Sequence, residues 1–69
     1  MKRILTIEGM SCKHCVDRVT NGLKDIEGVK SVKVGLKKGT ATVKLNEEID
    51  DNILKNAVED MGYKVVDIK

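Results

Sequence analysis

Apolar and polar residues alternate with a period of two in four short segments of the chain. Such alternation is typical of strands that bury one face and expose the other. The four segments are 3–8, 32–36, 40–45 and 63–68. In the first segment Leu5 and Ile7 share a face, and in the last Tyr63 and Val65 do so. The pattern therefore predicts four strands, the second of which ends at Leu36.

Between the first two strands the apolar period lengthens to three and four residues, as in an amphipathic helix. The recurring apolar positions are Cys15, Val16, Val19, Leu23 and Ile26. Ser11 is a residue type favoured at the N-cap, and Gly28 is a stop signal typical of a helix C-terminus. Gly22 lies inside this segment and costs about 1 kcal/mol relative to Ala, so we expect packing to stabilise the helix.

A second helix is predicted before the last strand. Its apolar positions are Ile49, Ile53, Leu54, Ala57, Val58 and Met61. Asp50 is the expected N-cap of this helix, and Gly62 closes it. The segment Lys37-Lys38-Gly39, between the second and third strands, is a short glycine-containing loop suited to a hairpin.

The order of elements is strand, helix, strand, strand, helix, strand. Two crossover connections joined by a hairpin are typical of the split βαβ arrangement. We therefore predict an α+β fold of the ferredoxin-like type, βαββαβ, with a four-stranded antiparallel sheet and both helices on one face.

Length and composition narrow the class of protein. The chain has 69 residues, so we expect one domain over residues 1–69. It is 41% hydrophobic and 35% charged, which is typical of a globular protein. No apolar stretch approaches the roughly 20 residues of a membrane span, and the N-terminus lacks the apolar region of a secretory signal. We therefore expect a cytosolic protein that does not insert into a membrane.

Charge and aromatic content weigh against nucleic acid as a partner. The net charge is only +2, and Tyr63 is the single aromatic residue, whereas a platform for single strands needs several aromatic side chains. Lys13, Arg18 and Lys24 fall on the first helix, where acidic residues interrupt them. We expect these cations to form a solvated face, with a rim for an acidic partner as the alternative.

The two cysteines, Cys12 and Cys15, lie three residues apart where the first strand leads into the first helix. A disulfide between them would close a very small loop and stabilise the chain little. At a helix N-terminus the free N–H groups and the dipole lower a thiol pKa, and thiolate is the form that binds metal. Two soft thiolates favour Cu(I), because structural zinc and iron–sulfur clusters usually take four ligands.

We expect no enzymatic activity, because the sequence shows no nucleophile–base pair and no carboxylate dyad suited to turnover. A small dithiol oxidoreductase is the alternative from a different class, since a C-x-x-C motif near a βαβ pattern is typical of thioredoxin-like proteins. Against this alternative, neither an aromatic residue nor a proline accompanies the two cysteines.

The segment Gly9-Met10-Ser11-Cys12-Lys13-His14-Cys15 resembles the Met-x-Cys-x-x-Cys signature of the heavy-metal-associated (HMA) domains, and most closely that of the bacterial CopZ-type copper chaperones. The resemblance extends to Glu27-Gly28-Val29 and to Met61-Gly62-Tyr63, so it spans nearly the whole chain. It implies a copper chaperone that binds Cu(I) through Cys12 and Cys15 and delivers it by ligand exchange.

The same resemblance implies a copper-transporting P-type ATPase as the receiving partner, with a copper-responsive repressor as a second candidate. We expect the metal-free chain to be a monomer and two loaded chains to be able to share copper as a dimer. The alternatives are a metal-binding domain of a copper ATPase and a mercury- or zinc-binding relative. The start at Met1 without a linker favours a free-standing protein, and Ser11 stands where zinc-handling relatives tend to have aspartate.

Three further residues are candidates for auxiliary roles at the metal site. Met10 is expected to pack beneath the loop and shield it. His14 is expected to face solvent, with the alternatives of an occasional third ligand or of a charge beside the thiolates. Tyr63 is expected to cap the core at the same end of the molecule, and the resemblance implies that it lies beside the copper.

Overall fold

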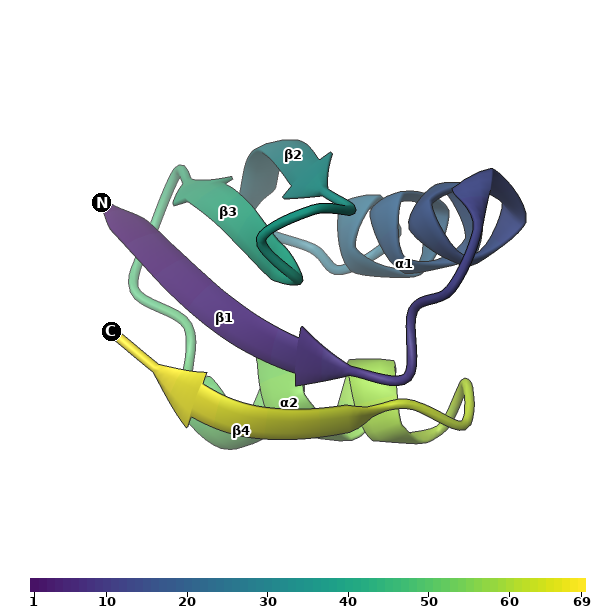
Figure 1. The fold of residues 1–69 in the computed structure, drawn as a ribbon. Helices are drawn as coiled ribbons and strands as arrows, with labels where there is room; N and C mark the ends of the chain where they lie inside the picture. The colour runs from purple at the N-terminus through teal and green to yellow at the C-terminus, as the bar shows by residue number, and fades with distance from the viewer.

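The structure, a computed structural model, describes all 69 residues and contains the predicted elements in the predicted order. They are β1 (Lys2–Glu8), α1 (Lys13–Lys24), β2 (Val29–Gly35), β3 (Thr40–Leu45), α2 (Asp51–Glu59) and β4 (Lys64–Ile68). The strands form one sheet in the order β2-β3-β1-β4, and every neighbouring pair is antiparallel. α1 packs on β2 and β3, α2 packs on β4, and the helices contact each other, so both cover one face (Figure 1). The predicted ferredoxin-like α+β fold is confirmed.

The core lies between the sheet and the two helices and contains only hydrophobic side chains. Its buried members are Leu5, Ile7, Val19, Leu23, Ala41, Val43, Leu45, Ile49, Leu54, Val58 and Val65. No polar side chain is buried, so no hydrogen bond has to compensate for lost hydration in the core. Neither helix has the length and apolar character needed to cross a bilayer.

The hairpin between β2 and β3 differs from the prediction at one residue. The last pair of the ladder joins Gly35 to Thr40, and Gly39 adopts φ +64°, with its N–H donating to the carbonyl of Leu36 at 3.3 Å. Leu36 therefore belongs to the turn and is 42% exposed. Its predicted place on the inner face is wrong, because the alternation of faces stops where strand pairing stops.

The boundaries of α1 also differ from the prediction. Cys12, and not Ser11, is the N-cap, with extended backbone (φ −155°, ψ 173°) and no capping hydrogen bond from its side chain. The helix ends at Lys24, and the Asp25 N–H donates to the Asn21 carbonyl at 3.1 Å. Ile26 consequently lies beyond the helix, where it packs against the core from the connection to β2.

Helix α2 begins as predicted, with Asp50 as its N-cap. The Asp50 carboxylate accepts a hydrogen bond from the Asn52 N–H at 2.9 Å. Leu54 and Val58, one turn apart, point into the core. Ile53 lies about 100° around the helix from Leu54 and is 50% exposed, so its predicted place on the apolar face is wrong.

The Asp50 cap gives a prediction about stability. Replacing Asp50 with Ala should lower the free energy of unfolding by about 1 kcal/mol, because it leaves a first-turn N–H of α2 without its partner. Urea unfolding followed by circular dichroism measures the loss. Asp51→Ala is the matched control, since it removes an exposed ion pair to Arg3 (3.2 Å) that contributes little. A larger loss in the control than in Asp50→Ala would contradict the assignment of the cap.

Candidate metal centre

The candidate site is the loop of residues 9–12, which connects the end of β1 to the start of α1. On one side the Ile7 N–H donates to the Gly39 carbonyl at 2.7 Å, so the β2–β3 hairpin borders the exit of β1. On the other side lies Tyr63, in the turn between α2 and β4. Gly9 adopts φ +101°, and a Cβ there would lie 3.4 Å from Tyr63 Cδ1. A glycine at this position permits both the left-handed backbone and the close aromatic neighbour.

Two free thiols are held at the start of α1. Cys12 is exposed and Cys15 is half-buried, and their Sγ atoms lie 3.8 Å apart. The Cys12 carbonyl accepts hydrogen bonds from the N–H groups of Cys15 (3.1 Å) and Val16 (3.3 Å), which closes the first turn. Because no side chain caps this helix, its remaining N–H groups and the positive end of its dipole act on the two sulfurs.

The separation of the sulfurs fits a shared metal ion. With thiolate bonds of about 2.3 Å, as for zinc, sulfurs 3.8 Å apart subtend roughly 110° at the metal. A linear arrangement would need the sulfurs about 4.6 Å apart, which rotation of the exposed Cys12 side chain can provide. At this separation both thiolates can bond one ion at an angle close to tetrahedral, and a wider separation of the sulfurs would give the trigonal or linear arrangement of an ion with fewer ligands.

Cys15 has a strongly perturbed pKa. The largest cause is a hydrogen bond from the Tyr63 hydroxyl, which with the backbone of Ser11 lowers the pKa of the Cys15 thiol from 9.0 to about 6. Partial burial opposes the shift, and Cys12 adds smaller favourable contributions. At neutral pH the Cys15 side chain is therefore mostly thiolate, the form that binds metal.

The pKa of Tyr63 is shifted in the opposite direction. Its pKa is raised, chiefly because its hydroxyl donates to Cys15, while Arg18 counteracts part of the rise. The hydroxyl therefore stays protonated and remains a donor at neutral pH. The sequence predicts Tyr63 at this end of the molecule, as the structure has it, but predicts only a solvated surface charge for Arg18. Arg18 follows Cys15 by three residues in α1, and residues three apart on a helix are neighbours on its surface. This spacing is the sequence signal that places Arg18 near the site.

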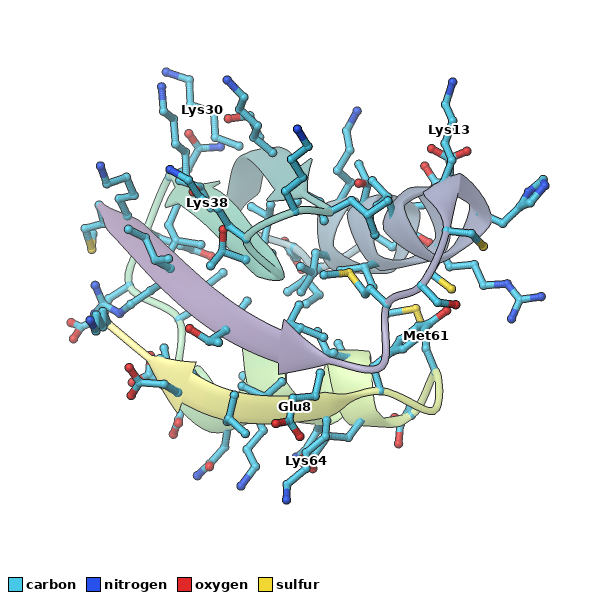
Figure 2. The ribbon with its side chains drawn as sticks, in the orientation of Figure 1. Glu8, Lys13, Lys30, Lys38, Met61 and Lys64 are labelled. Atoms are coloured by element: carbon cyan, nitrogen blue, oxygen red, sulfur yellow. The ribbon has the colours of Figure 1, made fainter.

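The other predicted auxiliary residues lie apart from the two sulfurs in different ways. Met10 is half-buried and packs against the core beneath the loop. His14 is exposed in the first turn of α1. No group of three or more His, Cys, Asp or Glu side chains could hold a metal together, so His14 does not join the two thiols in this conformation. Lys13 extends from the start of α1 away from the ribbon (Figure 2).

Removing the Tyr63 hydroxyl gives a prediction about pH. Tyr63→Phe keeps the ring but deletes the donor, so the pKa of Cys15 should rise from about 6 towards 9.0. Because thiolate is the reactive form, alkylation of Cys15 at neutral pH should slow. Mass-resolved alkylation between pH 5 and 9 measures the midpoint, with Met10→Leu as a control that leaves the hydroxyl in place. Coincident profiles for wild type and Tyr63→Phe would show that the hydroxyl does not tune the thiol.

Comparison with known proteins places the chain among metal-handling domains. Residues 4–64 match the heavy-metal-associated domain family. The chain is 41% identical over 66 residues to the copper chaperone CopZ of Staphylococcus aureus strain MRSA252, covering 94% of this chain and 97% of that protein. A solved CopZ metallochaperone superposes with a TM-score of 0.90 at 40% identity, covering 96% of this chain and 100% of the other.

The fold is also shared with a domain of a P-type ATPase. A copper-binding domain from HMA7, a P-type ATPase, superposes with a TM-score of 0.83 over 100% of this chain and 99% of the other. At 24% identity this likeness concerns the fold alone. The two similar proteins at 40% and 41% identity are named as chaperones and not as enzymes.

Proposed function

Since the chain belongs to the heavy-metal-associated domain family, we propose that it is a cytosolic copper chaperone that holds Cu(I) between Cys12 and Cys15 and passes it to a protein acceptor. The observation that carries this proposal is the pair of free thiols 3.8 Å apart where the loop of residues 9–12 meets the start of α1, with Cys12 exposed and Cys15 half-buried. The likeness to CopZ proteins over nearly the whole chain supports copper as the cargo.

Ligand number supports Cu(I) over zinc and over an iron–sulfur cluster. Structural zinc takes four ligands, and iron–sulfur clusters usually take four cysteines. The chain contains two cysteines and one histidine, and no carboxylate gathers beside them. Cu(I) is satisfied by two thiolates, which are soft ligands matched to it.

Transfer follows from the open coordination position. A thiolate of the acceptor bonds to the bound Cu(I), giving a three-coordinate intermediate, and one chaperone sulfur then leaves. A second acceptor thiolate displaces the remaining sulfur, so copper stays Cu(I) throughout and no electron is exchanged. Loading releases up to two thiol protons, and because the pKa of Cys15 is about 6, copper affinity should fall as the pH falls below that value.

We propose a metal-binding domain of a copper-transporting P-type ATPase as the acceptor, with a copper-responsive repressor as a second one. The same fold occurs in a copper-binding domain of a P-type ATPase, so such ATPases contain a domain of the kind proposed as acceptor. Lys13 and Arg18 are exposed beside the thiols, so an acidic acceptor surface would be attracted to this end of the molecule.

A transfer assay tests the proposal. The Cu(I)-loaded chain is mixed without oxygen with a metal-free domain of a copper ATPase, and copper is followed after the two proteins are separated. We expect copper to reach the acceptor faster than it reaches a small thiol chelator, when the acceptor and the chelator supply equal concentrations of free thiol groups. Transfer no faster than spontaneous release into buffer would contradict a chaperone role.

A further inference from the structure

Gly22 and Met61 form a close contact behind the metal site. A Cβ built on Gly22 would lie 2.7 Å from Met61 Cε and 2.8 Å from Met61 Sδ. Carbon atoms in contact are normally about 3.5–4.0 Å apart, so any other residue at position 22 would overlap the methionine. The end of the Met61 side chain therefore occupies a notch in α1 that exists only because residue 22 is glycine.

The contact lies on the face of α1 that carries Cys15. Gly22 follows Cys15 by seven residues, which is close to two helical turns, or about 10 Å along the axis. Met61 and Tyr63 are two residues apart in the turn that joins α2 to β4. α1 packs against α2, β2 and β3 but makes no close backbone approach to β4. The seated methionine thus attaches this turn directly to the helix that bears Cys15.

Apart from the Met61 side chain and the Tyr63 hydroxyl itself, which acts on Cys15, the turn is held by α2. The N–H groups of Met61 and Gly62 donate to the carbonyls of Val58 (3.1 Å) and Glu59 (3.0 Å), and both acceptors belong to α2. Nothing lies within 4 Å of a Cβ built on Gly62. Figure 2 shows Met61 at the end of the molecule where β1 leads into α1.

We propose that Met61, seated against Gly22, is a positioning residue that holds the α2–β4 turn against α1 and thereby keeps the Tyr63 hydroxyl beside Cys15. An unbranched thioether suits this task because it adapts to an irregular gap between elements. The placement of Tyr63 does not depend on the metal. The consequence for copper exchange rests on the proposed function.

Gly22→Ala is the direct test. The added methyl meets only the far end of a flexible side chain, so the fold should survive while Met61 leaves its notch. Tyr63 is the only aromatic residue, so tyrosine fluorescence of the metal-free chain reports on it alone. We expect the acrylamide quenching constant to rise about twofold. This factor corresponds to the smallest interaction energies found between residues in contact. Asn21→Ala, at an exposed position of α1, also raises helix propensity, by a smaller amount than Gly22→Ala, without touching Met61, and it should leave quenching unchanged.

A double-variant cycle shows whether the effect passes through Met61. Met61→Ala alone should also raise quenching, and Gly22→Ala added to it should have little further effect, because the clashing atoms are gone. Equal effects of Gly22→Ala in both backgrounds, or wild-type quenching in Gly22→Ala, would overturn the proposal.

Copper exchange provides the second readout. Gly22→Ala should speed Cu(I) release to a competing thiol by the same factor as Tyr63→Phe, and should add nothing in a Tyr63→Phe background. Additive acceleration would overturn the claim that Met61 acts through Tyr63. Should the chain fail to bind Cu(I) at all, the proposed function fails, while quenching in the metal-free chain still decides the placement of Tyr63.

Discussion

Exchanging both thiols for hydroxyls, in the double variant Cys12→Ser/Cys15→Ser, is expected to abolish tight Cu(I) binding while the fold remains intact. A serine hydroxyl is not ionised at neutral pH and is a poor ligand for a soft metal. Loss of an outer-shell partner already costs about 10–100-fold in metal affinity, so loss of both ligands should cost more than about 10³-fold. Anaerobic competition against a Cu(I) chelator measures the loss.

The fold should tolerate the substitution because neither sulfur belongs to the core. Cys12 occupies the N-cap with extended backbone and makes no capping hydrogen bond, whereas serine is among the favoured N-cap residues. Cys12→Ser should therefore unfold at the same urea concentration as wild type or a higher one. Ser11→Ala, one residue earlier, is the matched control and should bind copper normally. Undiminished Cu(I) competition by the double variant would place the copper site elsewhere.

The second large effect concerns the choice of metal. We expect Cu(I) to displace Zn(II) completely at equimolar concentration, because a single chain offers zinc only two of the four ligands it prefers. Loss of even an outer-shell partner lowers metal affinity about 10–100-fold. The missing ligands should therefore lower the affinity for zinc by more than about 10²-fold. Ser11 supplies no carboxylate that could compensate.

Competitive loading followed by native mass spectrometry measures this selectivity. A Ser11→Asp variant is the matched comparison, because it adds a hard oxygen ligand beside the thiols. It should reduce the difference between the affinities for Cu(I) and Zn(II). If zinc binds one per chain and equimolar copper does not displace it, the copper assignment fails. A zinc site shared between two chains, and completed by His14, would then be the better account.

The fold was predictable because each element has a clear period. Alternating positions in β1 and β3 and the apolar stripe of α1 agree on which face is buried, so the element order followed directly. The residues wrongly predicted to face the core lie at the end of a strand or at the margin of a helix face. Leu36 continues the alternation past the end of strand pairing, and Ile53 lies at the margin of the apolar stripe of α2, about 100° around the helix from Leu54. Periodicity does not show where strand pairing ends or how wide a helix face is covered.

The candidate site was predictable only in its local part. Cys12 and Cys15 are close in sequence, so a helix start brings them together whatever else the chain does. The effect of the Tyr63 hydroxyl on the pKa of Cys15 and the contact of Met61 with Gly22 join segments distant in the chain. Sequence periodicity places these residues on the correct elements, but tertiary packing decides which atoms meet.

The most direct test of the central claim is an anaerobic Cu(I) titration of the wild-type chain against a competing chelator, with the product weighed by native mass spectrometry after thiol alkylation. We expect one Cu(I) per chain, with Cys12 and Cys15 both protected from alkylation until the metal is removed. A chain that takes up copper with both thiols still open to alkylation, or that cannot compete with the chelator, would contradict it.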